Sequence, residues 1–267
     1  TEELGKIEGN KLVSPGPKLR KKNRIKTIQA TLAIEGNTLT IDQITAVLEG
    51  KEVLGPKKEI IEVQNAIELY EDLLSYKPYL VKDFLRAHKK LMAKLIESNG
   101  VFRDKNVGVL KGSKVSHVAP KPRLVPELIE NLFKWAKSEK ELHSLIKSCI
   151  LHYEIEFIHP FEDGNGRMGR FWQTVVLTGY DPIFAYLPIE SLIKDNQKKY
   201  YNTLEKCDQA GNCTEFIEFT LNLILKSLKE FSENLSGLVV DSSGRLAQAK
   251  SFFGDKLFSR KDYIIYF

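Results

Sequence analysis

Residues 159–170 read His-Pro-Phe-Glu-Asp-Gly-Asn-Gly-Arg-Met-Gly-Arg, and this stretch decides how the rest of the chain is interpreted. It places a histidine, a carboxylate, an amide, three glycines and two arginines within twelve residues. Glycines allow successive backbone N–H groups to converge on an anion, and a helix that begins there adds the positive end of its dipole. The stretch therefore predicts a binding site for phosphate groups, which neither a core helix nor an ordinary surface loop would require.

The first half of the stretch carries a candidate base and a candidate metal ligand. Pro160 disfavours helical geometry at His159, so the imidazole is expected in a loop, where it can titrate near neutral pH and act as general base. Phe161 is the apolar residue that would anchor this loop. Asp163 stands at the mouth of the glycine turn, where a magnesium ion can take one carboxylate and complete its shell with water and phosphate oxygens.

The second half carries the cations. Arg167 and Arg170 are three residues apart on the predicted helix and lean back toward its N-terminus, so both guanidinium groups can reach the anion. Parts of the stretch allow plainer interpretations, because a single loop histidine is more often structural and Asp-Gly-Asn-Gly alone is typical of a surface turn. A base before the turn and two arginines after it favour a catalytic site. The spacing differs from a Walker phosphate loop, which needs a lysine and a serine or threonine after the glycines.

Apolar periodicity elsewhere predicts an all-α fold, a helical bundle around this segment. One helix start is marked by a capping box, because Thr40 and Gln43 have the required types and spacing. At 107–118 the pattern changes to alternation around a turn, which predicts one β-hairpin. Helices are expected at about 18–35, 41–49, 57–75, 82–97, 126–137, 141–156, 165–178, 189–208 and 214–234.

Composition indicates an ordinary globular protein. Of 267 residues, 28% are charged and 42% apolar, and the formal charge of +5 is mild. Much of the basic excess lies at 18–26 without interleaved aromatic residues, which favours a solvated helix face over a nucleic-acid surface. Three cysteines without metal-ligand spacing indicate reduced thiols, and the sequence shows neither a secretion signal nor a membrane span. We therefore expect a cytoplasmic protein with no membrane partner.

On the residues quoted above, the chain resembles the Fic family, whose members carry His-Pro-Phe-x-Asp/Glu-Gly-Asn-Gly-Arg-x-x-Arg. The resemblance implies a protein adenylyltransferase, which transfers AMP from ATP to a Ser, Thr or Tyr hydroxyl of a target protein and releases pyrophosphate. It implies that His159 takes the hydroxyl proton and that Asp163 holds the Mg²⁺ that bridges the α- and β-phosphates. Toxin-type phosphotransferases of the family carry lysine where this chain has Gly166, which favours AMP transfer over phosphate transfer.

The same resemblance assigns roles to the rest of the stretch. Phe161 would hold the loop in the core, and Arg170 would hold the γ-phosphate. The charge logic agrees, because attack on the α-phosphorus develops negative charge that fixed amides, arginines and a metal can offset. The implied catalytic residues are His159, Asn165 and Arg167. The implied nucleotide-binding residues are Gly164, Asn165, Gly166, Arg167 and Arg170.

A second motif lies near the N-terminus, where residues 31–37 read Thr-Leu-Ala-Ile-Glu-Gly-Asn. This is similar to the family's inhibitory motif, Ser/Thr-x-x-x-Glu-Gly/Asn-Asn, whose glutamate pairs with the second arginine and displaces the γ-phosphate; Glu35 and Arg170 are the implied pair. Two alternatives stay open: the segment simply closes a helix, or Glu35 orients a water that removes AMP from a modified target. The motif residues are Thr31, Glu35, Gly36 and Asn37. A second Glu-Gly-Asn at 8–10 has Leu4 in place of Ser or Thr, and we interpret it as accidental.

The resemblance divides the chain into an N-terminal arm with inhibitory helix at 1–50, a Fic catalytic domain at 51–240, and the start of a winged-helix-like module at 241–267. The hairpin at 107–118 matches the family's flap, which docks a target protein by strand addition. A regulatory protein that binds DNA through the C-terminal module is the alternative from another class, and a homodimer stays open. Retention of His159 favours chemistry, since a pure binding module needs no base.

Overall fold

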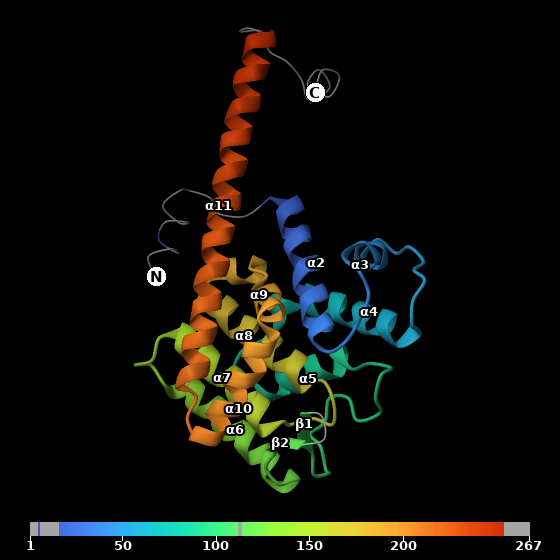
Figure 1. Ribbon diagram of the computed structural model, residues 1–267, viewed down its shortest axis with the longest axis vertical. Coiled ribbons are helices and arrows are strands. Elements are labelled where there is room, and N and C mark those ends of the chain that lie inside the picture. The colour runs from blue at the N-terminus through green and yellow to red at the C-terminus, as the bar shows by residue number, and fades with distance from the viewer. Residues whose placement is uncertain (1–4, 6–15, 112–113, 254–267) are drawn as a thin grey trace. The chain divides into compact units, whose positions relative to one another are not determined.

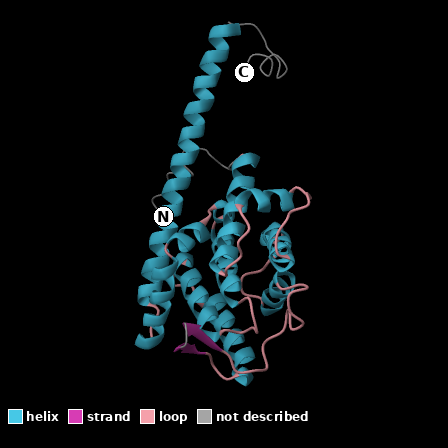
Figure 2. Cartoon of the chain, turned by 45° about the vertical axis from the view of Figure 1, so that its right-hand side comes forward, coloured by secondary structure: helices cyan, strands magenta, loops and turns pink. Residues whose placement is uncertain are grey.

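The computed structural model describes Gly5, residues 16–111 and residues 114–253 (Figure 1). Within these residues, helices make up nearly all of the regular structure and one two-stranded antiparallel sheet completes it, which confirms the predicted all-α fold with a hairpin (Figure 2). The α-helices are α2 (Pro17–Ile34), α3 (Ile41–Leu48), α4 (Lys57–Glu71), α5 (Val81–Leu91), α6 (Val125–Ser138), α7 (Ser144–Ile158), α8 (Asn165–Tyr180), α9 (Ile189–Asp195), α10 (Gln197–Ala210) and α11 (Thr214–Phe253). The strands are β1 (Gly108–Lys111) and β2 (Lys114–Val118), and the short 3-10 helices are η1 (Leu73–Ser75), η2 (Pro122–Leu124) and η3 (Pro182–Tyr186).

The chain divides into two compact units. The larger, Gly16–Ser227, contains every element from α2 to α10 and the first part of α11. The second includes the chain from Leu228 onward. All residues of the predicted site lie in the larger unit, which is the one described below.

α7 and α8 pack against each other in the larger unit and are joined by the loop that carries His159. They approach most closely at Gly169, where a Cβ atom would lie 2.9 Å from Cδ2 of His152 and 3.0 Å from Oε1 of Glu156. Any side chain there would force the helices apart, because protein interiors are close-packed. Most of α8 is buried, so the helix holds its N-terminus in a fixed place.

An aromatic cluster anchors the loop before α8 in the core. The buried Trp172 ring lies 5.0 Å from that of Phe84 and 5.8 Å from that of Phe133, centroid to centroid. Phe161 joins the cluster through Phe84 at 5.2 Å. Buried aromatic rings remove large apolar areas from water, so the cluster fixes α5, α6 and α8 against one another.

α2 packs against α4 and α9, and the polar contacts at its end hold its C-terminus. Gln197 donates from Nε2 to the carbonyl of Ile34 at 3.0 Å. The helix closes at Gly36, whose φ of 91° is a left-handed conformation that glycine adopts readily. The buried apolar side chains of α2 are those of Ile25, Ile28, Ala30, Leu32 and Ile34.

α3 begins as predicted. The Gln43 N–H donates to Oγ1 of Thr40 at 3.2 Å, and the Thr40 N–H donates to Oε1 of Gln43 at 2.9 Å, which confirms the capping box. The helix buries Ile44 completely. Two backbone donors at the helix start thus find partners within four residues of sequence, which is why the sequence alone locates this start well.

Two predicted helices are shorter or interrupted in the structure. The helix expected at 82–97 ends at Leu91, because the side chain of Asn65 caps it there. Nδ2 of Asn65 donates to the carbonyl of Leu91 at 3.0 Å and to that of Ala93 at 2.7 Å. The helix expected at 189–208 is divided at Asn196, whose Nδ2 donates to the carbonyl of Leu192 at 2.9 Å and so caps α9. At both breaks a side-chain amide donates to a helix carbonyl, and the Leu192 carbonyl also accepts from the backbone N–H of Asn196 at 3.2 Å.

Two further boundaries were also predicted wrongly. The helix expected from 141 begins at Ser144, so Leu142, expected in its buried face, lies before the helix and is 36% exposed. The helix expected at 214–234 continues to Phe253, because serine and glycine at 242–244 lower helix propensity by only about 1 kcal/mol each or less and no proline intervenes. The segment at 241–267, where the start of a winged-helix-like module was expected, is helical through Phe253, and the rest of it lies outside the described residues. Among the described residues, no helix combines the length and apolar character needed to cross a membrane.

Candidate active site

His159 closes α7 in a left-handed conformation, with φ 50° and ψ 61°. Its N–H donates to the carbonyl of Ile155 at 3.0 Å, and its Nδ1 lies 3.3 Å from the carbonyl of Glu156. A carbonyl can only accept, so this contact favours the neutral tautomer with the proton on Nδ1 and makes Nε2 the basic nitrogen. A neutral imidazole with its proton on Nδ1 is the form that a general base acting through Nε2 requires.

The loop after His159 is closed by the side chain of Asn165. The Phe161 N–H donates to Oδ1 of Asn165 at 2.8 Å, and Nδ2 of Asn165 donates back to the Phe161 carbonyl at 2.9 Å. Asn165 was expected to contact the nucleotide. In the structure its amide side chain holds the loop through Phe161; the contact with a nucleotide stays a prediction.

His88 supports the same loop from α5. Its ring stacks on Phe161 at 3.6 Å between centroids and 3° between planes. Nδ1 accepts from the Gly100 N–H at 2.9 Å, so the proton is on Nε2, which donates to the carbonyl of Asp163 at 3.0 Å. Burial lowers the pKa of His88 to about 4, so the ring is neutral at physiological pH. The sequence alone did not reveal the contact of His88 with this loop.

The N-terminus of α8 has no side-chain hydrogen-bond cap among the described residues. Gly164 has a φ of 83°, and a Cβ there would lie 2.8 Å from Sδ of Met92, so only glycine fits. Its N–H donates to the carboxylate of Asp163. No side chain among the described residues caps the helix, which leaves the following N–H groups of its first turn available to an anion.

Arg167 lies beside this terminus and is 5% exposed. Its Nη2 donates to Oδ1 of Asp163 at 3.0 Å and its Nη1 to Oε1 of Glu62 at 3.4 Å. Its Nε is buried and has no hydrogen-bond partner among the described residues. Glu62, on α4, was not singled out from the sequence because 105 residues separate it from Arg167.

Arg170 is 1% exposed and is held by the end of α2. Its Nε donates to Oγ1 of Thr31 at 3.0 Å, and its Nη2 donates to the Thr31 carbonyl at 3.1 Å and to Oε1 of Glu35 at 2.6 Å. Its Nη1 has no partner among the described residues. Burial disfavours the charge, but the surrounding negative groups, Glu35 foremost, outweigh it and raise the pKa of Arg170 above its usual value.

The Glu35 carboxylate lies directly over the first turn of α8. A Cβ built on Gly166 would lie 2.6 Å from Oε1 of Glu35 and 3.1 Å from Nη1 of Arg170. A carboxylate therefore stands at the place where the helix terminus and the Arg170 guanidinium would both receive an anion. Asn37 is fixed by a different helix, since its Nδ2 donates to Oε2 of Glu62 at 2.9 Å.

A buried polar network lies behind the site. The Tyr200 hydroxyl donates to Oε1 of Glu156 at 3.0 Å and lies 3.1 Å from Nε2 of His152, whose Nδ1 contacts Gln173. Burial would raise the pKa of Glu156, but His152, and then Arg170, outweigh it and lower this pKa. At 1% exposure, Tyr200 belongs to the core.

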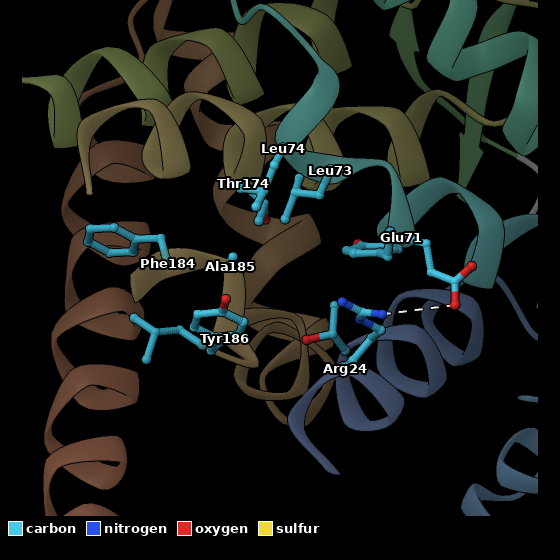
Figure 3. A pocket seen from close by; sticks show the side chains of 11 residues that line it. Arg24, Glu71, Leu73, Leu74, Thr174, Phe184, Ala185 and Tyr186 are labelled. Carbon is cyan, nitrogen blue, oxygen red and sulfur yellow. Dashed lines mark ion pairs between the residues drawn. The ribbon is translucent and has the colours of Figure 1, made fainter. Parts of the chain in front are cut away.

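One cavity that the structure shows is lined in part by Thr174, which lies one turn after Arg170 on α8 and donates from Oγ1 to the Arg170 carbonyl at 3.3 Å (Figure 3). Its volume is about 50 Å³, and α2, α4, η1, α8 and η3 contribute its walls. Arg24 and Glu71 form an ion pair at its edge, with 4.0 Å between Nη1 of Arg24 and Oε1 of Glu71. The lining side chains are those of Arg24, Thr27, Tyr70, Glu71, Leu73, Leu74, Thr174, Phe184, Ala185, Tyr186 and Leu187.

Comparison with known proteins gives a family match that includes the segment 159–170. A family model described as Fic/DOC matches residues 78–177. A crystal structure of a Fic family protein from Desulfovibrio desulfuricans G20 is 40% identical, with a TM-score of 0.80, and the match covers 99% of this chain and 80% of that one. The chain thus belongs to the Fic family. Fic-1 from C. elegans, residues 134–508, shares the fold at 19% identity and a TM-score of 0.70, over 90% of this chain and 72% of that one.

Curated relatives extend the comparison to named enzymes. The protein adenylyltransferase Fic of Drosophila erecta is 29% identical over 246 residues, which cover 84% of this chain and 47% of that protein. The Drosophila ananassae protein of the same name is 30% identical over 213 residues, 75% of this chain and 40% of that protein. The chain therefore spans about half the length of the curated relatives it matches.

Proposed function

We propose that this protein transfers AMP from ATP to a hydroxyl group of a target protein. The proposal rests on the arrangement of one loop: the tautomer favoured for His159 leaves Nε2 as its basic nitrogen, and the N-terminus of α8, which has no side-chain cap among the described residues, follows five residues later. Relatives named protein adenylyltransferase Fic support the same chemistry.

The proposed reaction uses each side chain for a separate task. Nε2 of His159 takes the proton from the target hydroxyl as its oxygen attacks the α-phosphorus, and pyrophosphate leaves. The N–H groups at the start of α8 stabilise the charge that develops on the phosphate oxygens. Arg167 and Arg170, whose guanidinium groups each keep one nitrogen without a hydrogen-bond partner in the described part of the chain, hold the phosphate chain.

The residues present fit a magnesium ion. Among the described residues, no group of three or more His, Cys, Asp or Glu side chains is placed to hold a metal. Mg²⁺ bound with a nucleotide needs only one or two protein carboxylates, and Asp163 offers one whose side chain is 46% exposed. The ion would offset negative charge on the phosphates when it is bound.

We propose further that Glu35 inhibits the transfer. Its carboxylate holds Arg170 at 2.6 Å over Gly166, so a γ-phosphate and Glu35 would compete for one guanidinium group. Allosteric couplings are typically about 1–3 kcal/mol, so removal of Glu35 should raise the rate between roughly 5-fold and 150-fold.

The test compares the Glu35→Gly variant with the wild type in parallel reactions with α-labelled and γ-labelled ATP. Incorporation of the α label alone, raised in the variant and lost in a Glu35→Gly, His159→Ala double variant, is the expected result. Glu8→Gly is the matched control, because residues 8–10 repeat Glu-Gly-Asn, and it should leave incorporation unchanged. Incorporation of the γ label alone would mean phosphorylation and would refute AMP transfer. Equal incorporation by Glu35→Gly and wild type would dismiss the inhibitory role.

A further inference from the structure

Arg103 lies between α5 and β1, is 5% exposed, and directs its hydrogen-bond donors at backbone carbonyls. Its Nε donates to the His159 carbonyl at 2.7 Å, and its backbone N–H donates to the Pro160 carbonyl at 3.0 Å. Its Nη2 donates to the carbonyls of Pro120 at 2.7 Å and Ile158 at 3.3 Å, and its Nη1 to that of Lys105 at 2.8 Å.

The carbonyls bound by Arg103 belong to two separate parts of the site. Three come from consecutive residues, 158–160, where α7 ends and the His159 loop begins. The other two, from Lys105 and Pro120, lie just outside the two strands of the hairpin, one before β1 and one after β2. A single planar guanidinium thus connects the two ends of the hairpin to the backbone around His159, the candidate general base.

His159 needs such support because its backbone is unfavourable. Apart from glycines, it is one of two described residues with positive φ, a conformation that costs an L-residue roughly 1–2 kcal/mol. The bond from Nε of Arg103 to the His159 carbonyl fixes the orientation of the peptide that follows this residue. Lysine could not replace it fully, because an ammonium group lacks the planar fork of donors.

Simple core filling does not explain the choice of arginine. Burial lowers the pKa of Arg103 and disfavours its charge, so the side chain is costly at this place. Its cost is offset only because every donor group of the side chain finds a carbonyl. An apolar side chain would fill the same space and leave all these carbonyls without this partner.

We infer that Arg103 is a positioning residue that fixes the distance between the hairpin and His159. If a target segment is held by the hairpin, this distance decides whether its hydroxyl meets Nε2 of the histidine. The inference rests on the proposed function for its catalytic consequence. Its structural part, the coupling of the hairpin to the His159 loop, does not depend on that function.

The catalytic consequence is tested in the Glu35→Gly protein at saturating ATP. Misplacement of a reacting group by about 1 Å costs on the order of 10²-fold in rate, so Arg103→Ala should slow incorporation of the α label by about that factor. ATP affinity measured by calorimetry should change less than twofold. Arg103→Lys should recover part of the rate, and added methylguanidine should recover part of the Arg103→Ala rate. The exposed Arg123, two residues before α6, is the matched control, and Arg123→Ala should change nothing.

Three results would overturn the inference: an unchanged rate in folded Arg103→Ala, an equal loss of ATP affinity and rate, or no recovery with either lysine or methylguanidine. Amide hydrogen exchange on the full chain with Arg103→Lys supplies a readout that needs no activity and covers a failure of the alanine variant to fold. Exchange at 108–111 and at 159–164 should accelerate together, and acceleration of only one segment would contradict the coupling. If Glu35→Gly incorporates no α label, the proposed function fails while the exchange result still decides the coupling.

Discussion

Replacement of Glu35 by glutamine should lower the stability of the protein and raise its affinity for ATP. The change keeps the size of the side chain but removes the charge that faces Arg170 at 2.6 Å. Loss of one partner of a buried ion pair costs about 3–5 kcal/mol, because the other charge stays buried without a counter-charge. Arg170 is 1% exposed, but the Glu35 side chain is 32% exposed, so part of this cost is screened by water. We expect a loss of about 1–3 kcal/mol in the free energy of unfolding.

The same substitution should strengthen ATP binding. A phosphate no longer has to displace a carboxylate from the Arg170 guanidinium, so the dissociation constant should fall by roughly 5-fold to 150-fold, which is the equivalent of about 1–3 kcal/mol. ATP at one hundred times its dissociation constant should add about 2.7 kcal/mol to the stability of the variant. The nucleotide would therefore restore approximately what the substitution removed.

Urea unfolding with and without ATP, together with calorimetric titration of ATP, measures both quantities. All proteins would carry His159→Ala, so that no transfer consumes the nucleotide. Glu49→Gln is the matched control, because Glu49 also makes short ion pairs, 2.8 Å to Lys21 and 2.8 Å to Lys51, but on the surface. It should lower stability less and leave ATP affinity unchanged. If Glu35→Gln is as stable as its parent and binds ATP equally, the Glu35–Arg170 pair contributes nothing and the competition argument is wrong.

Two further predictions concern stability. Burial raises the pKa of Glu190 to about 7, so between pH 4.5 and 7 this carboxyl keeps its proton in the fold and loses it in the unfolded chain. The contribution of Glu190 to stability should therefore fall as pH rises through that range, by roughly 3 kcal/mol at most, whereas the contribution of His88, whose pKa is lowered to about 4, should rise. The melting temperature of Glu190→Gln relative to the wild type should therefore increase as pH rises from 4.5 to 7, and parallel curves for the two proteins would exclude the shift. Phe161→Ala should cost about 3–5 kcal/mol in urea unfolding, because the ring is fully buried against His88 and Phe84, and Phe161→Leu should cost clearly less. A loss below 1 kcal/mol for the alanine variant would show that the ring does not anchor the loop.

The sequence predicted the features whose causes lie close together in the chain. The capping box of α3 depends on residues three apart, and the glycine turn before α8 depends on backbone freedom at Gly164. Glu35 was paired with Arg170 from the family motif alone, and the structure brings the two side chains into contact. These motifs carry their own geometry, so they can be recognised without the fold.

The features that the sequence did not reveal depend on residues far apart. Arg103 stands in a segment without periodicity, and its partners at 158–160 follow more than fifty residues later. Glu62 meets Arg167 only because α4 packs near the start of α8. Asn65 ends α5 by a bond across 26 residues, so the apolar stripe beyond Leu91 predicted a helix that does not continue. In each case tertiary packing supplies a partner for a backbone or charged group, and no local pattern records it.

The contacts on either side of Glu35 determine how it can leave Arg170. Thr31, one turn before it, is bonded to the same guanidinium through its hydroxyl and its carbonyl. Asn37, two residues after it, donates to the Glu59 carbonyl and to the Glu62 carboxylate. With the backbone fixed at both points, the carboxylate can swing aside by rotation of its own side chain, without unfolding the last turn of α2. Binding of a nucleotide would then require only a change of the Glu35 rotamer, which occurs on a timescale of nanoseconds, and not the slower displacement of a helix.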